Sequence, residues 1–185
     1  MQTVYRVVCC LALVGLFGAS AFAQDKEEGF VPLFDGKSFA GWKTTDRTPK
    51  SWKVEEGLLV LMGGNSHLFT EKEFDNFIIR YQFRPKKKGY NSGFYIRGKN
   101  QINLAQRDAG RLFGYKNTKA VPDLHKEPGE WNEWEVTCNG PNVTLKVNGK
   151  LAWSIDNFRP KSGVIGIQAE GRAIDFKNIR IKSLD

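Results

Sequence analysis

Polar side chains alternate with apolar ones in three short segments of the sequence, residues 92–98 (SGFYIRG), 101–106 (QINLAQ) and 164–171 (VIGIQAEG). Since a β-strand turns successive side chains to opposite faces, the apolar set is expected to face a core and the polar set the other surface. Amide, guanidinium and phenol groups hold donors and acceptors at fixed angles, which suits a ligand rich in hydroxyl groups. The polar side chains of these segments are Tyr95, Arg97, Gln101, Asn103, Gln168 and Glu170.

Two interpretations of this polar set differ in function. Antiparallel sheets commonly turn polar side chains to solvent, so the six residues can be an ordinary exposed face. They can also line a binding site, and Gly166, between the apolar Ile165 and Ile167, is then expected to leave room for a ligand ring. The site hypothesis requires the six side chains to converge on one hollow.

The elements that must position this face are strands. Alternation with a period of two is clearest in residues 77–84 (FIIRYQFR), and no helical pattern extends beyond about three turns. Asn148-Gly149 predicts a tight hairpin, because this dipeptide adopts positive φ angles at little cost. A change of apolar phase predicts a β-bulge near Lys177-Asn178. Many short strands without alternating helices predict an all-β antiparallel sandwich forming a single domain.

The N-terminus predicts export. Arg6, an apolar run from Val7 to Phe22 and the small-residue pattern before Gln24 are typical of a signal peptide over residues 1–23. An uncleaved anchor is the alternative, although the run is shorter than the roughly 20 residues of a comfortable membrane span. We expect a short disordered lead-in over 24–29, a periplasmic or extracellular location and no stable membrane insertion after cleavage.

The formal net charge of +8 does not by itself indicate a nucleic-acid partner. Basic residues are scattered, and their one run, Lys86–Lys88, lies between Pro85 and Gly89, where a solvated loop is expected. Cys138 falls in the apolar phase of a strand and is predicted to be a free core residue. The oligomeric state is not predicted.

Other chemistries have weaker support in the sequence. Glu133 and Glu135 share one strand face, as a glycosidase pair could, but paired strand glutamates are commonly solvated. No close-spaced ligands of a zinc site are present, so no metal site is predicted, although a divalent cation as cofactor is left open. His125 lies in a proline-bounded loop, where it can be solvated or approach a cleft. Asp108 favours a loop salt bridge over a cation site.

Several motifs resemble one known family, the 3-keto-disaccharide hydrolase domain, over residues 30–185. The resemblance rests on an opening VPLFDGKSFAGW, an NSG…R strand, a glycine–tyrosine turn, a GEWN corner, an asparagine–glycine hairpin and a last strand with phenylalanine and asparagine. It implies a concanavalin-like, laminarinase-like jelly roll. The residues at the matching positions are Asn91, Arg97, Tyr115, Trp131, Gln168, Phe176 and Asn178.

Two departures from the family pattern change the titratable set. Gln101 stands where the family usually has a glutamate, and Glu170 stands where it often has a histidine. The resemblance implies a small carbohydrate substrate already oxidised at the 3-hydroxyl, whose glycosidic bond is cleaved by base-assisted elimination and hydration. Glu170 is then the candidate base, with Arg97 and Gln168 as donors.

The remaining predicted contacts are to substrate rather than to the reacting atoms. They involve planar amides, aromatic rings and the loop histidine. Because one fold can carry different functions, a non-catalytic carbohydrate-binding module is the alternative function. The predicted substrate-binding residues are Asn91, Tyr95, Gln101, Asn103, Tyr115, Trp131 and His125.

Overall fold

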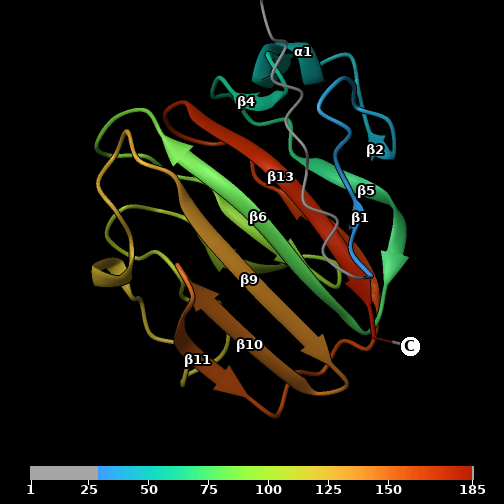
Figure 1. Ribbon diagram of the computed structural model, residues 1–185, viewed down its shortest axis with the longest axis vertical. Helices are drawn as coiled ribbons and strands as arrows, with labels where there is room; N and C mark the ends of the chain where they lie inside the picture. The colour runs from blue at the N-terminus through green and yellow to red at the C-terminus, as the bar shows by residue number, and fades with distance from the viewer. Residues whose placement is uncertain (1–28, 185) are drawn as a thin grey trace, which may run out of the picture.

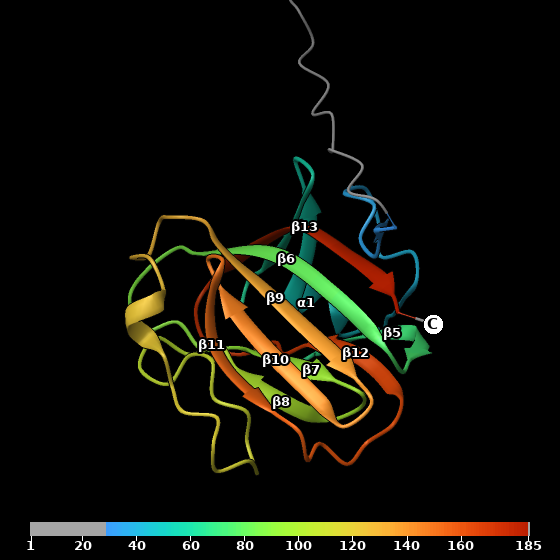
Figure 2. The same ribbon diagram turned by 60° about the horizontal axis from the view of Figure 1, so that its bottom comes forward.

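Two antiparallel β-sheets pack face to face (Figures 1 and 2), so the predicted all-β sandwich is confirmed. The computed structural model describes residues 29–184, and the predicted signal peptide therefore lies outside the described residues, as does nearly all of the predicted lead-in. Within that range the helices are limited to α1 (Thr48–Ser51) and the 3₁₀ turn η1 (Pro122–Leu124). No helix among the described residues has the length and apolar character needed to span a membrane.

The larger sheet has eight strands and forms the front layer in Figure 1. Its strands run in the order β11 (Lys150–Ile155), β10 (Asn142–Val147), β9 (Asn132–Asn139), β6 (Phe77–Pro85), β13 (Ile174–Ser183), β4 (Leu58–Leu61) and β3 (Trp52–Glu55), with β1 (Val31–Pro32) also paired to β13.

The smaller sheet has five strands, and Figure 2 shows part of it as a second layer behind β9 and β10. Its order is β2 (Trp42–Lys43), β5 (Leu68–Phe74), β12 (Gly163–Ile167), β7 (Gly93–Ile96) and β8 (Asn100–Asn103).

The core lies between the sheets, because each sheet turns its apolar phase inward. Tyr81 of β6 stacks on Phe94 of β7 with ring centroids 4.5 Å apart, and Trp134 of β9 packs edge-on against Tyr81. All three side chains are inaccessible to solvent. Cys138 is also buried and free, as predicted. The interior is therefore a continuous aromatic and aliphatic layer, which leaves only the outer faces and loops for ligands.

The predicted hairpin and bulge are confirmed. Asn148 and Gly149 join β10 to β11 with φ angles of 50° and 78°, as a primed turn requires. In β13 the pairing register with β6 shifts between Lys177 and Arg180, and Asn178 between them has a φ of 51°. The extra residue lets both halves of β13 face the core.

Arg97 does not continue the polar face of Tyr95, so that prediction is wrong. The residue has a φ of 42°, a left-handed conformation that interrupts the alternation of β7. Its side chain turns away into the structure and is only 2% exposed.

The Arg97 guanidinium instead joins loops of both sheets. Nε donates to the Asp75 carbonyl at 2.6 Å and Nη1 donates to the carbonyls of Gly140 at 2.6 Å and Pro160 at 3.0 Å. Nη2 donates to Asn76 Oδ1 at 3.2 Å. Such charge-assisted bonds from a buried group stabilise the fold, and they leave the guanidinium no role on the outer face.

Replacing Arg97 by methionine should destabilise the fold by about 3 kcal/mol or more, because hydrogen bonds to charged groups contribute roughly 1.5 to 3 kcal/mol each. Urea unfolding measures the change, and Arg107→Met, at an exposed position, is the matched control. If Arg97→Met is as stable as the wild type but no longer binds ligand, Arg97 is a ligand-binding residue and its structural role is refuted.

Candidate functional site

The outer face of the five-stranded sheet, turned away from the core, carries a row of side chains set by strand register. Gly166 of β12 pairs with Phe69 of β5 on one side and with Tyr95 of β7 on the other. Tyr95 in turn pairs with Gln101 of β8. Paired residues of neighbouring strands project on the same side, so these four positions form one line across the sheet.

A second row lies beside the first. The Gln168 backbone N–H donates to the Gly93 carbonyl at 2.8 Å, and Gly93 pairs with Asn103 of β8. Across this row the Gln101 side-chain amide donates to Gln168 Oε1 at 2.9 Å. Four of the predicted residues are thus brought together on one face: Tyr95, Gln101, Asn103 and Gln168.

The two glycines of the face are covered by neighbouring side chains. A Cβ atom at Gly166 would lie 2.5 Å from the Phe69 ring, and one at Gly93 would lie 2.1 Å from Gln101 Nε2. The expectation that Gly166 leaves room for a ligand ring is therefore wrong. Phe69 occupies the space and packs against Tyr95, with ring centroids 5.3 Å apart. The row becomes an aromatic floor instead.

Glu170 follows β12 at one end of this face, next to His67, which was not among the predicted site residues. The His67 ring lies 5.8 Å from the Tyr95 ring, centroid to centroid. Burial raises the pKa of Tyr95, and the Glu170 carboxylate raises it further. Burial lowers the pKa of His67, opposed by Glu170 and reinforced by Lys99. We call His67, Tyr95 and Glu170 the titratable cluster.

The protonation of His67 follows from one hydrogen bond. The Ala169 backbone N–H donates to His67 Nδ1 at 3.1 Å, so Nδ1 must present its lone pair. With its pKa lowered, the ring is neutral at pH 7 and carries its proton on Nε2. His67 is therefore a neutral imidazole that can donate a hydrogen bond from Nε2, with the Glu170 carboxylate close by.

The opposite edge of the face is polar. Asn103 Nδ2 donates to Asp108 Oδ2 at 3.2 Å, and Arg111 pairs with the same oxygen at 4.0 Å. The predicted salt bridge of Asp108 is thus present.

Asn91 lies at the other end of the face, against Gly171, the residue after Glu170. A Cβ atom at Gly171 would approach the Asn91 backbone to within 2.7 Å. Asn91 therefore flanks the titratable cluster.

Trp131 lies on the wrong sheet to contact this face, so its prediction as a substrate contact is not supported. Its ring is held between two cations of the eight-stranded sheet, with Arg84 at 4.7 Å and Lys177 Nζ at 4.1 Å from the ring centroid. The strand pair Glu133 and Glu135 is also on that sheet, where Glu135 binds Arg80 at 2.6 Å. These carboxylates belong to ion pairs.

His125 is also withdrawn from the predicted site. Its Nε2 accepts a hydrogen bond from Trp134 Nε1 at 2.8 Å, and its Nδ1 lies 2.9 Å from the Val121 carbonyl. The imidazole must then carry its proton on Nδ1. Burial lowers the pKa of His125, partly offset by backbone bonds to Val121 and Pro122. The loop histidine is half-buried, and it serves the core by accepting the hydrogen bond of the buried Trp134 indole.

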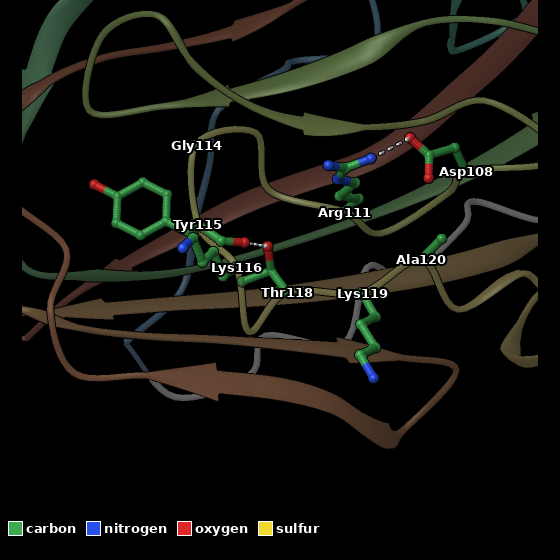
Figure 3. Close-up of a pocket in the computed structure, with 8 residues that line it drawn as sticks. All are labelled: Asp108, Arg111, Gly114, Tyr115, Lys116, Thr118, Lys119 and Ala120. Carbon is green, nitrogen blue, oxygen red and sulfur yellow. Dashed lines mark hydrogen bonds and ion pairs between the residues drawn. The ribbon is translucent and has the colours of Figure 1, made fainter.

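Tyr115 lies beyond the polar edge, in the loop between β8 and β9. It borders a cavity of about 410 Å³ whose lining includes Asp108, Arg111 and Thr118 (Figure 3). Figure 3 shows its ring turned away from the Asp108–Arg111 pair, and it packs against Phe158 with centroids 5.3 Å apart. Tyr115 thus borders a loop cavity rather than the titratable cluster.

His67 and Phe69 were not among the predicted site residues, although their spacing carried a signal. Both flank Leu68, which is buried, in the segment 67–70 (HLFT), and Thr70 is buried as well. This is the same alternation that identified Tyr95. As to metals, within residues 29–184 no three or more His, Cys, Asp or Glu side chains gather closely enough to hold an ion.

Solved structures with this architecture identify the fold. A candidate glycosyl hydrolase of Parabacteroides distasonis superposes with a TM-score of 0.68 at 24% identity, covering 85% of this chain and 95% of that one. A β-glucanase of Bacillus licheniformis gives 0.61 at 10% identity, covering 84% and 97%. The carbohydrate-binding module CBM66 of Bacillus subtilis gives 0.57 at 16%, covering 77% and 96%. The fold is a concanavalin-like jelly roll.

Sequence comparison narrows this class to one family. The 3-keto-alpha-glucoside-1,2-lyase-like domain matches residues 29–182, and the chain belongs to that family. A relative in Bacteroides thetaiotaomicron, named 3-keto-disaccharide hydrolase, is 31% identical over 85% of this chain and 79% of its own length. The resemblance seen in the sequence motifs is confirmed.

The two histidines should show opposite neutral tautomers. ¹⁵N-edited NMR at pH 7 is expected to place the proton of His67 on Nε2 and that of His125 on Nδ1, since Ala169 N–H and Trp134 Nε1 donate to the other nitrogens. Both should titrate below the ordinary value of 6.5. A protonated His67 Nδ1 at pH 7 would contradict the assigned geometry.

Acid should destabilise the fold through His125. Its pKa is lowered in the folded state, so protons bind the unfolded chain more readily, and stability present above pH 6.5 is lost as the pH falls below it. In His125→Gln, which keeps a donor and an acceptor, the decline of the unfolding midpoint between pH 6.5 and pH 5 should be shallower. An equal decline in both proteins would refute this role.

Proposed function

We propose that this protein, after export, cleaves the glycosidic bond of 3-keto-glycosides on the outer face of its five-stranded sheet. Membership of the 3-keto-alpha-glucoside-1,2-lyase-like family and the name of the Bacteroides relative support the substrate class. The observation that carries the proposal is the titratable cluster, in which the Glu170 carboxylate acts on both His67 and Tyr95 beside a surface of neutral amides.

The chemistry requires one base and one site for negative charge. A ketone at C3 acidifies the proton on C2, which the base removes to form an enolate. The electron pair then expels the glycosidic oxygen from C1, which leaves as an alcohol after it takes up a proton. Water adds to the resulting double bond and completes the hydrolysis. Unlike an ordinary glycosidase, this route does not need two carboxylates at a fixed separation.

Glu170 is the base in this proposal, since it is the carboxylate of the cluster and is exposed to an incoming substrate. His67 is the donor to the enolate oxygen, through the proton that its tautomer places on Nε2. A neutral imidazole is suited to this task because its pKa is closer to that of an enol than an imidazolium's would be. His67 takes the donor role that the sequence gave to Arg97.

The surrounding amides bind and orient the sugar. Gln168 and Gln101 already share a hydrogen bond at 2.9 Å, and their remaining donors and acceptors are available to hydroxyl groups. Phe69 and Tyr95 supply an aromatic floor on which the apolar face of a sugar ring can rest. These contacts hold the C2 proton within reach of the base, which is the positioning that the reaction requires.

The test is glucose release from 3-keto-trehalose by the mature protein and by Glu170→Gln. Loss of the base should lower kcat by about 10²- to 10⁴-fold, while KM changes little, because the amide is isosteric. Glu130→Gln, an exposed carboxylate in the loop before β9, is the matched control and should retain activity.

The alternative function is a non-catalytic carbohydrate-binding module, which the likeness to CBM66 makes concrete at the level of the fold. If neither 3-keto-trehalose nor related keto-sugars release glucose, with or without a chelator, the catalytic proposal fails. Retained affinity for the same sugars would then favour the binding module.

A further inference from the structure

The polar face extends one strand beyond the five-stranded sheet. Leu112 forms an isolated antiparallel bridge with Ile102, and both side chains are buried. On either side of the bridge, Asn103 N–H donates to the Arg111 carbonyl at 2.8 Å and Phe113 N–H donates to the Gln101 carbonyl at 3.0 Å. Arg111 and Phe113 therefore project on the side of Asn103 and Gln101.

Phe113 lines a cavity of about 560 Å³ at this edge of the sheet, which we call the edge groove. Phe113 is 44% exposed, so part of its ring is open to a ligand. Around it stand amides and a guanidinium, the donor and acceptor types that hydroxyl groups need. The edge groove is lined by Asn100, Phe113, Tyr115, Asn117, Asn157 and Arg159, among others.

The edge groove has the composition of a binding site without the means of cleavage. Its lining includes two aromatic residues and three amides, but none of the lining residues is acidic and none is a histidine. Lys116 and Arg159 add donors and positive charge. A sugar held there would be oriented by stacking and hydrogen bonds and would meet no base.

The spacing separates this groove from the titratable cluster. Neighbouring strands are about 4.8 Å apart. The Arg111–Phe113 segment is therefore two strand steps, roughly 10 Å, from β7 with Tyr95, and three steps, roughly 14 Å, from β12, which leads to Glu170. A disaccharide with one ring over the cluster would end near β8. Ligand groups in the edge groove must therefore belong to a longer chain.

We propose that the edge groove is an additional sugar-binding subsite, and that the substrates are 3-keto-oligosaccharides longer than two units. This inference rests on the proposed function for the end of the chain that is cleaved. The unmodified sugars of the chain lie across Gln101 and stack on Phe113, while the oxidised unit lies over the titratable cluster. Binding energy from the far units thereby positions the reacting unit.

Isothermal titration with unmodified gluco-oligosaccharides tests the subsite independently of turnover. The probes are the maltose and cellobiose series of two, three and four units. In at least one series, affinity should rise by about tenfold from two units to four, and Phe113→Ala should bring the ratio of the two affinities close to one. Leu151→Ala, which removes an exposed apolar side chain on β11, should keep the ratio.

Two further results make the outcome decisive. Thermal unfolding of Phe113→Ala should match the wild type, because the ring is half exposed, and this separates lost binding from lost folding. No gain of affinity with length in either series, or a gain that survives Phe113→Ala, overturns the subsite. Glucose release from 3-keto-trehalose with no such gain leaves the proposed function standing and removes only this inference.

Discussion

The antiparallel register of β5, β12, β7 and β8 is the constraint on which the rest of the structure depends. Because side chains alternate along each strand, one register places the apolar phase in the core and the polar phase on the outer face. A slip of one residue would bury Gln168 and expose Ile167. The packing of Tyr81 on Phe94 therefore fixes the outer face as firmly as it fixes the core.

The two outer faces of the sandwich differ in how their charges are used. On the eight-stranded sheet the cations are largely matched with acids, as in Arg80 with Glu135 and Arg84 with Asp175. On the five-stranded sheet the central residues are uncharged amides and aromatic rings, with Glu170 at one end. The central residues of the candidate site thus contribute nothing to the net positive charge of the chain.

The sequence pattern correctly predicted the features that depend only on neighbouring residues, namely strand faces, a hairpin and a bulge. Alternation placed Tyr95, Gln101 and Gln168 on one face, and Asn148-Gly149 and the phase change in β13 located a hairpin and a bulge. Arg97 escaped prediction because its φ is positive, which spacing does not reveal. Trp131 contacts Arg84 and Lys177, which are distant in sequence, so its surroundings could not be predicted from local pattern. His125 contacts the nearby Trp134, but only because its loop folds back, which residue spacing does not reveal.

Gly93 leaves the middle of its row in the candidate site without a side chain of its own. With no side chain in the middle of its row, it allows Gln101 to reach Gln168 across the strand between them. Side-chain rotation is fast and needs no movement of the backbone. A rotation of Gln101 away from Gln168 would uncover the main chain at Gly93 and would free both amides for ligand hydroxyl groups. A rigid scaffold can in this way accommodate rings of different pucker and thickness.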